Sequence, residues 1–191
     1  MDIDKITKAN TNYIGKRVVY FEEIDSTQLE AKRNKQKYEN GTIIIADIQT
    51  AGKGTHGRIW HTKSNNIAIT IVLKPQANIK QLEGFTVSIA EHIKNVVKKL
   101  YNINLEVKLP NDLLLNNKKI CGILTEVITV QENIKELFIG IGFNVNEDEF
   151  SNDILNIATS LYNETKQRYC REDIICEIIE NIEKELDTRI F

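Results

Sequence analysis

In the first third of the chain, residues 49–60 read Gln49-Thr50-Ala51-Gly52-Lys53-Gly54-Thr55-His56-Gly57-Arg58-Ile59-Trp60. This stretch holds three of the nine glycines within six residues, and no acidic residue occurs between Gln49 and Asn66. Apolar runs at Ile43–Ala46 and Ile67–Leu73 flank it, and both have the composition of buried strands. Glycines let the backbone approach an anion closely, and lysine and arginine supply positive charge. The stretch therefore predicts a phosphate-binding loop held between two strands.

Gly52, Gly54 and Gly57 also satisfy the pattern G-x-G-x-x-G. A dinucleotide-binding fingerprint requires a helix that begins at the third glycine and an acidic residue about 20 positions later. Here a polar run leads instead into another strand, so that reading is excluded. A protein kinase would contain H-R-D and D-F-G motifs, which this sequence lacks. On the loop alone, a basic surface loop without a ligand remains an equal alternative.

Composition excludes several further classes of protein. The 191 residues carry a net charge of −2 with a pI of about 6.0, so the chain lacks the basic field of nucleic-acid binders. No apolar run reaches the ~20 residues that cross a bilayer, and the polar N-terminus has no signal-peptide core. Cys121, Cys170 and Cys176 are widely spaced and predict buried, reduced thiols. We expect a soluble, cytoplasmic protein with one domain over residues 1–191, and no membrane or nucleic-acid partner.

The first half of the chain predicts two strands and a helix before the loop. Residues 1–15 are polar and predict a short helix or a loose arm. Residues 17–21 are strand-like, and Asp25-Ser26-Thr27 marks the start of a surface helix that extends to about Lys37. Thr27 and Glu30 have the spacing of a capping box. Asn40-Gly41 then turns the chain into a strand over residues 42–47.

The second half predicts two amphipathic helices around further strands. Apolar residues recur every three or four positions from Leu82 to Leu100 and again in a C-terminal helix over about 171–188. Between them lie strands at 104–108 and 137–142 and a hairpin of residues 113–115 and 118–130 with a two-residue turn. This order predicts an α+β fold, a mixed and largely antiparallel sheet packed with helices.

Four stretches, in their order and spacing, resemble the biotin protein ligases, or biotin–acetyl-CoA-carboxylase ligases. They are Asp25-Ser26-Thr27, the glycine-rich loop, Lys108-Leu109-Pro110-Asn111-Asp112 with Lys119-Ile120-Cys121-Gly122, and Gly140-Ile141-Gly142-Phe143-Asn144-Val145-Asn146. Each motif alone is weak, but the ordered set is specific. The resemblance covers about residues 18–160 and implies the catalytic domain of that family.

The resemblance implies a reaction of two steps in one site. The carboxylate of biotin attacks the α-phosphate of ATP, with Mg²⁺, and yields biotinyl-5′-adenylate and pyrophosphate. A lysine amine of a biotin carboxyl carrier protein then attacks this mixed anhydride. Because two anions must be brought together, the chemistry needs positioned cations and N–H donors rather than a nucleophilic side chain.

The same resemblance assigns residues to biotin. Hydroxyl and amide groups are suited to hydrogen-bonding a ureido ring, and glycines allow close approach. For Ser26 and Thr27 the alternative is simple capping of the helix, and both roles are compatible. Gly122 and Gly140 are expected to let the backbone approach the ligand. The biotin-binding set is Ser26, Thr27, Gln49, Gly52, Lys53 and Gly122.

A second set is assigned to the nucleotide. Lys119 and Arg58 are the implied catalytic residues, and Asn111 with Asp112 would orient phosphate and Mg²⁺. The alternative for Trp60 is ordinary core packing. For Lys119 the alternative is a solvated lysine beside a turn. That alternative suits Lys118 better, because Lys119 enters an apolar strand, where burying an unpaired charge is costly. The ATP-binding set is Gly54, Thr55, Arg58, Ile59, Trp60, Lys108, Asn111 and Lys119.

The sequence departs from the family pattern at three positions. The usual loop reads G-R-G-R-x-x-R, whereas Lys53 and Thr55 replace its first two arginines, and Leu109 replaces a tryptophan. A threonine supplies neither charge nor a planar pair of donors. Either Lys53 or His56 compensates, or the adenylate is held less tightly, or the activity has changed.

Three hypotheses follow from the resemblance. The first is a biotin protein ligase without the N-terminal DNA-binding domain and the C-terminal small β-barrel of many relatives. The second is a lipoyl or octanoyl transferase of the same fold, and the third is a non-catalytic binder of biotin or its adenylate. Members of the family often dimerise, so a homodimer is a candidate assembly.

Overall fold

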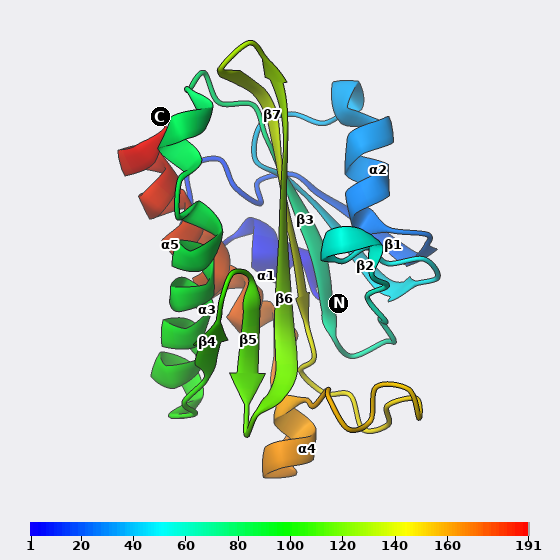
Figure 1. The fold of residues 1–191 in the computed structure, drawn as a ribbon. Helices are drawn as coiled ribbons and strands as arrows, with labels where there is room; N and C mark the ends of the chain where they lie inside the picture. Colours follow the sequence, from blue (N-terminus) through cyan, green and yellow to red (C-terminus); the bar gives the residue numbers. More distant parts are fainter. Residues whose placement is uncertain (191) are drawn as a thin grey trace.

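The structure, a computed structural model, describes residues 1–190. Its strands form a seven-stranded sheet in the order β1-β2-β3-β7-β6-β5-β4 (Figure 1). The strands are β1 (Val18–Ile24), β2 (Thr42–Gln49), β3 (Ile67–Leu73), β4 (Glu106–Lys108), β5 (Asp112–Leu115), β6 (Lys118–Val130) and β7 (Asn133–Phe143). β1 and β2 run parallel, and the other neighbouring pairs within the described residues run antiparallel. The predicted α+β fold is confirmed.

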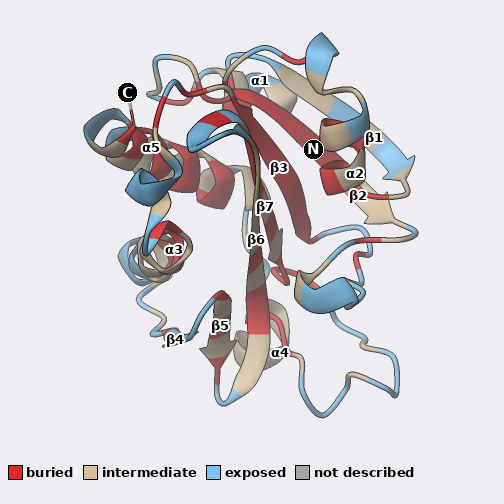
Figure 2. Cartoon of the chain, turned by 45° about the horizontal axis from the view of Figure 1, so that its top comes forward, coloured by how far each residue is buried: buried red, intermediate tan, exposed pale blue. Residues whose placement is uncertain are grey.

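Helices cover the two faces of the sheet unequally. Helices α1 (Ile3–Thr7), α3 (Phe85–Tyr101) and α5 (Arg171–Arg189) share one hydrophobic core with Ile43 and Ile45, while α2 (Thr27–Arg33) packs on Ile44 from the other face. This alternation is the period-2 geometry of a strand. Figure 2 shows that β2 and β3 are buried for most of their length. The short helix α4 (Leu161–Thr165) follows the loop after β7.

The predicted hairpin is confirmed. β5 and β6 are joined by Asn116 and Asn117, whose φ angles are 51° and 64°. A two-residue hairpin turn of type I′ has positive φ at both central positions, and asparagine tolerates that conformation better than most residues.

Helix α2 differs from the prediction in its cap and its burial. The N-cap is Ser26, whose hydroxyl accepts the Leu29 N–H at 3.4 Å, so Thr27 is the first helical residue and the Thr27–Glu30 capping box is wrong. The helix ends at Arg33, and a 3₁₀ turn, η1 (Lys35–Lys37), follows. The expected surface position is also wrong, because Thr27, Gln28 and Glu30 are buried. Their polar groups are satisfied by hydrogen bonds, which lets a helix of low hydrophobicity lie against the sheet.

The other helices agree better with the sequence. α3 begins at Phe85, later than predicted, because Gly84 adopts a left-handed φ of 71° and separates it from the 3₁₀ turn η3 (Ile79–Leu82). The N-terminal region contains the predicted short helix, α1. The carboxylate of Glu183 in α5 then accepts the backbone N–H groups of Asn12, Tyr13 and Ile14 and holds this region in place.

The cysteines are free, as predicted, but only one is buried. Cys121 lies in the core, whereas Cys170, at the N-cap of α5, is exposed and Cys176 is partly exposed. The prediction of three buried thiols is therefore wrong, since α5 begins at the surface. Among residues 1–190, no helix is long and apolar enough to cross a membrane.

Candidate functional site

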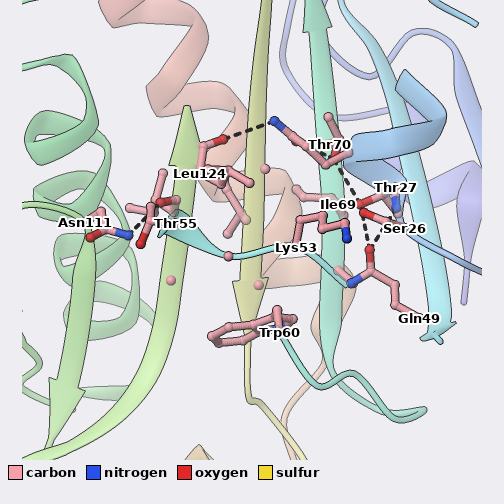
Figure 3. Close-up of a pocket in the computed structure, with 18 of the residues that line it drawn as sticks. Ser26, Thr27, Gln49, Lys53, Thr55, Trp60, Ile69, Thr70, Asn111 and Leu124 are labelled. Atoms are coloured by element: carbon pink, nitrogen blue, oxygen red, sulfur yellow. Dashed lines mark hydrogen bonds between the residues drawn. The ribbon is translucent and has the colours of Figure 1, made fainter. Parts of the chain in front are cut away.

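A cavity lies on the α2 side of the sheet, beneath the loop of residues 50–66 that connects β2 to β3 (Figure 3). It holds about 440 Å³ of empty space, partly open to solvent. The sequence motifs meet here. The lining residues from the predicted sets are Ser26, Thr27, Gln49, Lys53, Gly54, Thr55, Trp60, Asn111, Lys119 and Gly122.

One end of the cavity is rich in hydrogen-bonding groups from β2 and the start of α2. The Gln49 Oε1 atom accepts the Thr27 N–H at 2.8 Å and the Thr27 hydroxyl at 3.1 Å. Gln49 Nε2 donates to the Thr62 hydroxyl at 2.9 Å, which fixes both ends of the amide. Ser26 is buried and is both the N-cap of α2 and a cavity-lining residue. Thr27 is also buried and lines the cavity, but it is the first helical residue and its hydroxyl donates to Gln49 instead of capping the helix.

Two residues outside the predicted sets extend this polar end. The Thr70 Oγ1 atom lies 3.0 Å from both Thr27 Oγ1 and Gln28 Oε1. Gln28 Nε2 donates to Glu126 Oε2 at 2.9 Å, and a Cβ on Gly140 would lie 2.7 Å from Gln28 Oε1. The single hydroxyl proton of Thr70 cannot serve both oxygens when Thr27 donates to Gln49. One oxygen at this end therefore lacks a donor in the protein and can accept a hydrogen bond from a ligand.

The opposite side of the cavity carries positive charge. Lys119 Nζ lies 2.7 Å from Asp112 Oδ1 and 5.4 Å from the centroid of the Trp60 ring. The Lys119 side chain is 30% exposed, whereas the neighbouring Lys118 reaches toward the Leu155 carbonyl, outside the cavity lining. The structure thus separates the two lysines as the sequence interpretation did, and the charge of Lys119 is paired with a carboxylate.

The indole of Trp60 lies across the strand pair β6–β7. A Cβ on Gly142 would overlap the Trp60 ring, and one on Gly122 would lie 3.1 Å from Trp60 Cζ3 and 3.2 Å from Lys119 Nζ. A Cβ on Gly52 would overlap the Trp60 carbonyl oxygen, and the Trp60 N–H donates to the Gly52 carbonyl at 2.9 Å. These three glycines therefore make room for Trp60 and Lys119 as well as for any ligand.

Asn111 and Asp112 lie at the start of β5, beside Lys119. Asn111 Nδ2 donates to the Ile123 carbonyl at 3.0 Å, and the side chain is buried. Residues 1–190 contain no cluster of three or more His, Cys, Asp or Glu side chains that could hold a metal ion. One carboxylate and one amide fit a Mg²⁺ ion that is bound mainly by substrate phosphates, which is how the ion is commonly held.

Comparison with known proteins places this site in a family. Residues 18–144 match the model of the Biotin/lipoate A/B protein ligase family. The chain belongs to this family. It is 33% identical over 178 residues to the bifunctional ligase/repressor BirA of Bacillus spizizenii, which covers 91% of this chain and 55% of the relative. The biotin–[acetyl-CoA-carboxylase] ligase of Paracoccus denitrificans is 33% identical over 124 residues, or 63% of this chain and 51% of the relative. The chain thus spans about half the length of these two relatives.

Solved structures of family members have the same fold. The biotin protein ligase of Aquifex aeolicus in complex with biotin and ATP superposes with a TM-score of 0.79 at 28% identity, over 91% of this chain and 71% of that one. The Leishmania major ligase in complex with biotin gives a TM-score of 0.73 at 22% identity, over 88% and 73%, and supports the fold alone. The resemblance to the catalytic domain of the biotin protein ligases is confirmed.

Five predicted site residues of this family member do not line the cavity. Gly52 and Asp112 contact lining residues, as described above. Arg58 is exposed and folds back on its own loop, where Nη2 donates to Thr55 Oγ1 at 2.6 Å and Nε to the Thr55 carbonyl at 3.1 Å. Ile59 is 67% exposed, and Lys108 is exposed on β4. Contacts of these residues with a nucleotide stay predictions.

Sequence reasoning missed the polar residues that complete the cavity. Thr70 was recognisable as the one hydroxyl within the apolar run Ile67–Leu73. Gln28 follows Ser26-Thr27 directly and was assigned to a surface helix instead. Gly140, Ile141 and Gly142 line the cavity and lie in the fourth family motif, in which Gly140 was expected to approach the ligand. No pattern in the chain pointed to the remaining lining residues, Ala68, Ile69, Ile123 and Leu124, as pocket-forming.

Proposed function

We propose that this family member is an ATP-dependent biotin protein ligase. It forms biotinyl-5′-adenylate from biotin and ATP and transfers the biotinyl group to a lysine of a biotin carboxyl carrier protein. Two relatives that are 33% identical to this chain are named as ligases, which supports this proposal. So does the likeness to the Aquifex aeolicus enzyme, whose structure contains biotin and ATP.

One observation carries the proposal: a single cavity joins a polar end to a cationic side. Thr27, Gln49 and Thr70 offer fixed hydroxyl and amide groups to a cyclic urea. Lys53 and Lys119 line the same cavity and can bind a carboxylate and a phosphate. A molecule with a ureido ring at one end and a carboxylate at the other matches both parts.

In the first step, a carboxylate oxygen of biotin forms a bond to the α-phosphorus of ATP, and the bond to the bridging oxygen breaks to release pyrophosphate. Lys119 would stabilise the negative charge on the non-bridging oxygens of the transition state. In the second step, the carrier amine attacks the carbonyl carbon, AMP leaves with the bonding electrons, and the amine loses a proton to form an amide.

Magnesium would be held by the phosphates of ATP with Asn111 and Asp112 beside them. When bound, it neutralises phosphate charge. The protein's own contribution is to position the two anions and to pair their charge with Lys119 and Lys53.

The lipoyl or octanoyl transferase is the second candidate, since the family name covers both activities. A dithiolane ring or an alkyl chain has no N–H donors, so it would leave without a partner the one oxygen among Thr27 and Gln28 that the Thr70 hydroxyl cannot serve. A site built to hydrogen-bond its substrate discriminates strongly against analogues that lack those groups. The polar end therefore favours biotin.

Two measurements test the proposal. Biotin-dependent exchange of pyrophosphate into ATP reports adenylate formation, and mass spectrometry of a carrier domain incubated with protein, biotin, ATP and Mg²⁺ reports transfer. We expect exchange with biotin but not with lipoate, and a carrier heavier by one biotinyl group. Exchange with lipoate alone would support the transferase, and biotin binding without exchange would support the non-catalytic binder.

A further inference from the structure

The loop over the cavity connects β2 and β3, and these two strands separate beneath it. β2 and β3 pair from Thr42↔Val72 to Ile45↔Ile69. Beyond Ile45 and Ile69, the described strands β2 and β3 no longer pair with each other. The end of β2 pairs with β1, at Gln49, and the start of β3 pairs with β7, at Ile67. The ends of β2 and β3 thus belong to different strand pairs, and no described ladder joins them between the Ile45↔Ile69 pair and the isolated Gln49↔Thr62 bridge. The Gln49↔Thr62 and Lys53↔Ile59 bridges join the two sides of the loop above this gap, and within the gap the stems are joined by a side chain instead.

A single arginine spans this gap. Arg171, the first residue of α5, donates from Nη1 to Asp47 Oδ1 at 2.9 Å and from the same nitrogen to the Asn66 carbonyl at 2.9 Å. Asp47 lies near the end of β2, and Asn66 immediately precedes β3. The guanidinium therefore contacts both stems at the point where their ladder is missing.

The position of Arg171 is itself fixed. The backbone just before α5 is held by the Asn146 side chain, which donates to the Tyr169 carbonyl at 2.8 Å and accepts the Tyr169 N–H at 2.9 Å. Asn66 is buried, and its side chain accepts the Val145 N–H at 2.9 Å. The stem of β3, the loop after β7 and the start of α5 are thus tied to one another.

The ion pair has little contact with solvent, so its removal has a cost. The side chains of Arg171 and Asp47 are 12% and 18% exposed. Burial would raise the pKa of Asp47, but hydrogen bonds from Tyr20 and Arg171 outweigh burial and hold this pKa below its ordinary value. The carboxylate therefore stays charged at neutral pH, and loss of the arginine would leave it with the Tyr20 hydroxyl but without the Arg171 charge.

Arg171 acts from the face of the sheet opposite to the cavity. Asp47 has the same parity along β2 as Ile43 and Ile45, which pack in the core with α5, and its carboxylate contacts Arg171 of that helix. Gln49, at the end of the strand, turns to Thr27 instead, and the cavity lies on the α2 side with Thr70. Arg171 is absent from the cavity lining, so any influence on the ligand passes through the loop.

We propose that Arg171 is a positioning residue, which holds the two stems of the loop at a fixed separation and so places Lys53 and Trp60 over the cavity. Its effect on turnover rests on the proposed function, whereas its effect on the loop does not.

The loop can be observed directly because Trp60 is the single tryptophan of the chain. We expect the acrylamide quenching constant of Trp60 fluorescence to rise about twofold in Arg171→Met, because the loop opens more often when its stems are released. Arg168→Met is the matched control, because the Arg168 side chain is 56% exposed and its ion pair with Asp148, at 3.8 Å, is a long surface contact. Its quenching constant should equal that of the wild type.

Two further variants separate positioning from general damage to α5. Asp47→Asn removes the charged partner without changing the helix and should raise quenching in the same direction. Arg171→Lys keeps the charge on a shorter side chain and should restore part of the wild-type value. Unchanged quenching in a folded Arg171→Met or Asp47→Asn protein, verified by circular dichroism, would overturn the proposal.

The enzymatic arm uses biotin-dependent pyrophosphate exchange. Arg171→Met should raise KM for ATP about tenfold, because small displacements of positioning groups weaken reaction geometry strongly. If the wild type shows no exchange, the proposed function fails while the quenching result still decides the role of Arg171. If exchange is normal in Arg171→Met although quenching rises, the link from the loop to the reaction is wrong.

Discussion

At the scale of single residues, the ion pair of Lys119 and Asp112 is the feature that most affects the chemistry. The side chain of Asp112 is 13% exposed and that of Lys119 is 30% exposed, so neither residue is fully solvated. An anion that enters the cavity must compete with Asp112 for Lys119. If a cation accompanies the anion, Asp112 can bind the cation while Lys119 binds the anion. The pair also keeps Lys119 extended over Trp60, at 5.4 Å from the ring centroid, where a cation–π contact adds a small attraction.

Lys119→Ala should lower biotin-dependent pyrophosphate exchange by about 100-fold or more, because it removes the cation aimed at the reacting phosphate. The free energy of unfolding should fall by about 1–3 kcal/mol, because Asp112 loses its charged partner. Lys118→Ala is the matched control and should leave exchange unchanged. Normal turnover in a folded Lys119→Ala protein would reject the assigned role of Lys119.

Gly142→Ala should displace the Trp60 indole, because its Cβ would overlap the ring. We expect a red shift of Trp60 fluorescence and a loss of about 1–3 kcal/mol in unfolding free energy, as in other overpacked sites. Gly54→Ala provides the comparison, since its Cβ would come no closer than 3.3 Å to the Arg58 carbonyl oxygen. Equal spectra for Gly142→Ala and the wild type would show that Trp60 does not rest on β7.

At the scale of elements, the loop of residues 50–66 is a folded hairpin rather than a free strap. Isolated β-bridges join Gln49 to Thr62 and Lys53 to Ile59. At its tip the 3₁₀ turn η2 (Thr55–Gly57) contains His56 at a φ of 56°, and Thr55 holds the Arg58 guanidinium by two hydrogen bonds. Both Lys53 and His56 are exposed, but Lys53 lines the cavity and His56 does not, so Lys53 is the better placed of the two to compensate for the missing arginine.

Thr55→Arg should slow the dissociation of biotinyl-adenylate, because Thr55 lines the cavity and an arginine there would add a charged, two-pronged donor. It would also release Arg58 from its hydroxyl partner. The off-rate is measured by displacement of labelled adenylate, with Thr55→Gln as the uncharged control of similar length. An off-rate equal to that of the wild type would mean that another group already fills this role.

At the scale of the whole molecule, several carboxylates link folding to pH. Glu30 is a clear case, because it is buried and accepts hydrogen bonds from Tyr38, Arg33 and Asn34. Burial raises its pKa, but these hydrogen bonds outweigh burial and bring the pKa below its ordinary value. The pKa of Asp25 is lowered mainly by its hydrogen bond with Arg33. The folded state therefore binds fewer protons than the unfolded state in acid.

Stability should accordingly be full above the ordinary carboxylate range of about pH 4 and fall as the pH drops below it. Glu30→Gln should be less stable than the wild type by about 1–3 kcal/mol at neutral pH, since it loses charge-assisted hydrogen bonds. This difference should shrink as the pH falls, because the wild-type carboxylate is protonated too. Urea unfolding at pH 7 and at lower pH measures it, and a difference independent of pH would contradict the linkage.

Much of the fold was predictable because its signals are local. The apolar run Ile67–Leu73 became β3 with the predicted bounds, and Asn116-Asn117 formed the predicted turn. The identity of the family also followed from short motifs in order. The errors at α2 have a physical cause. Its residues look like those of a surface helix because their partners, Thr70 and Glu126, lie far away in the chain.

The sequence by itself determined the strands, the main helices, the family and a basic glycine-rich loop, because each depends on neighbours along the chain. Only the tertiary structure decided that β2 and β3 separate, that Gln28 and Thr70 complete the polar end, that Arg58 turns back on Thr55, and that Arg171 ties the stems. These features arise from contacts between segments that are distant in sequence, and a pattern of nearest neighbours carries no information about them.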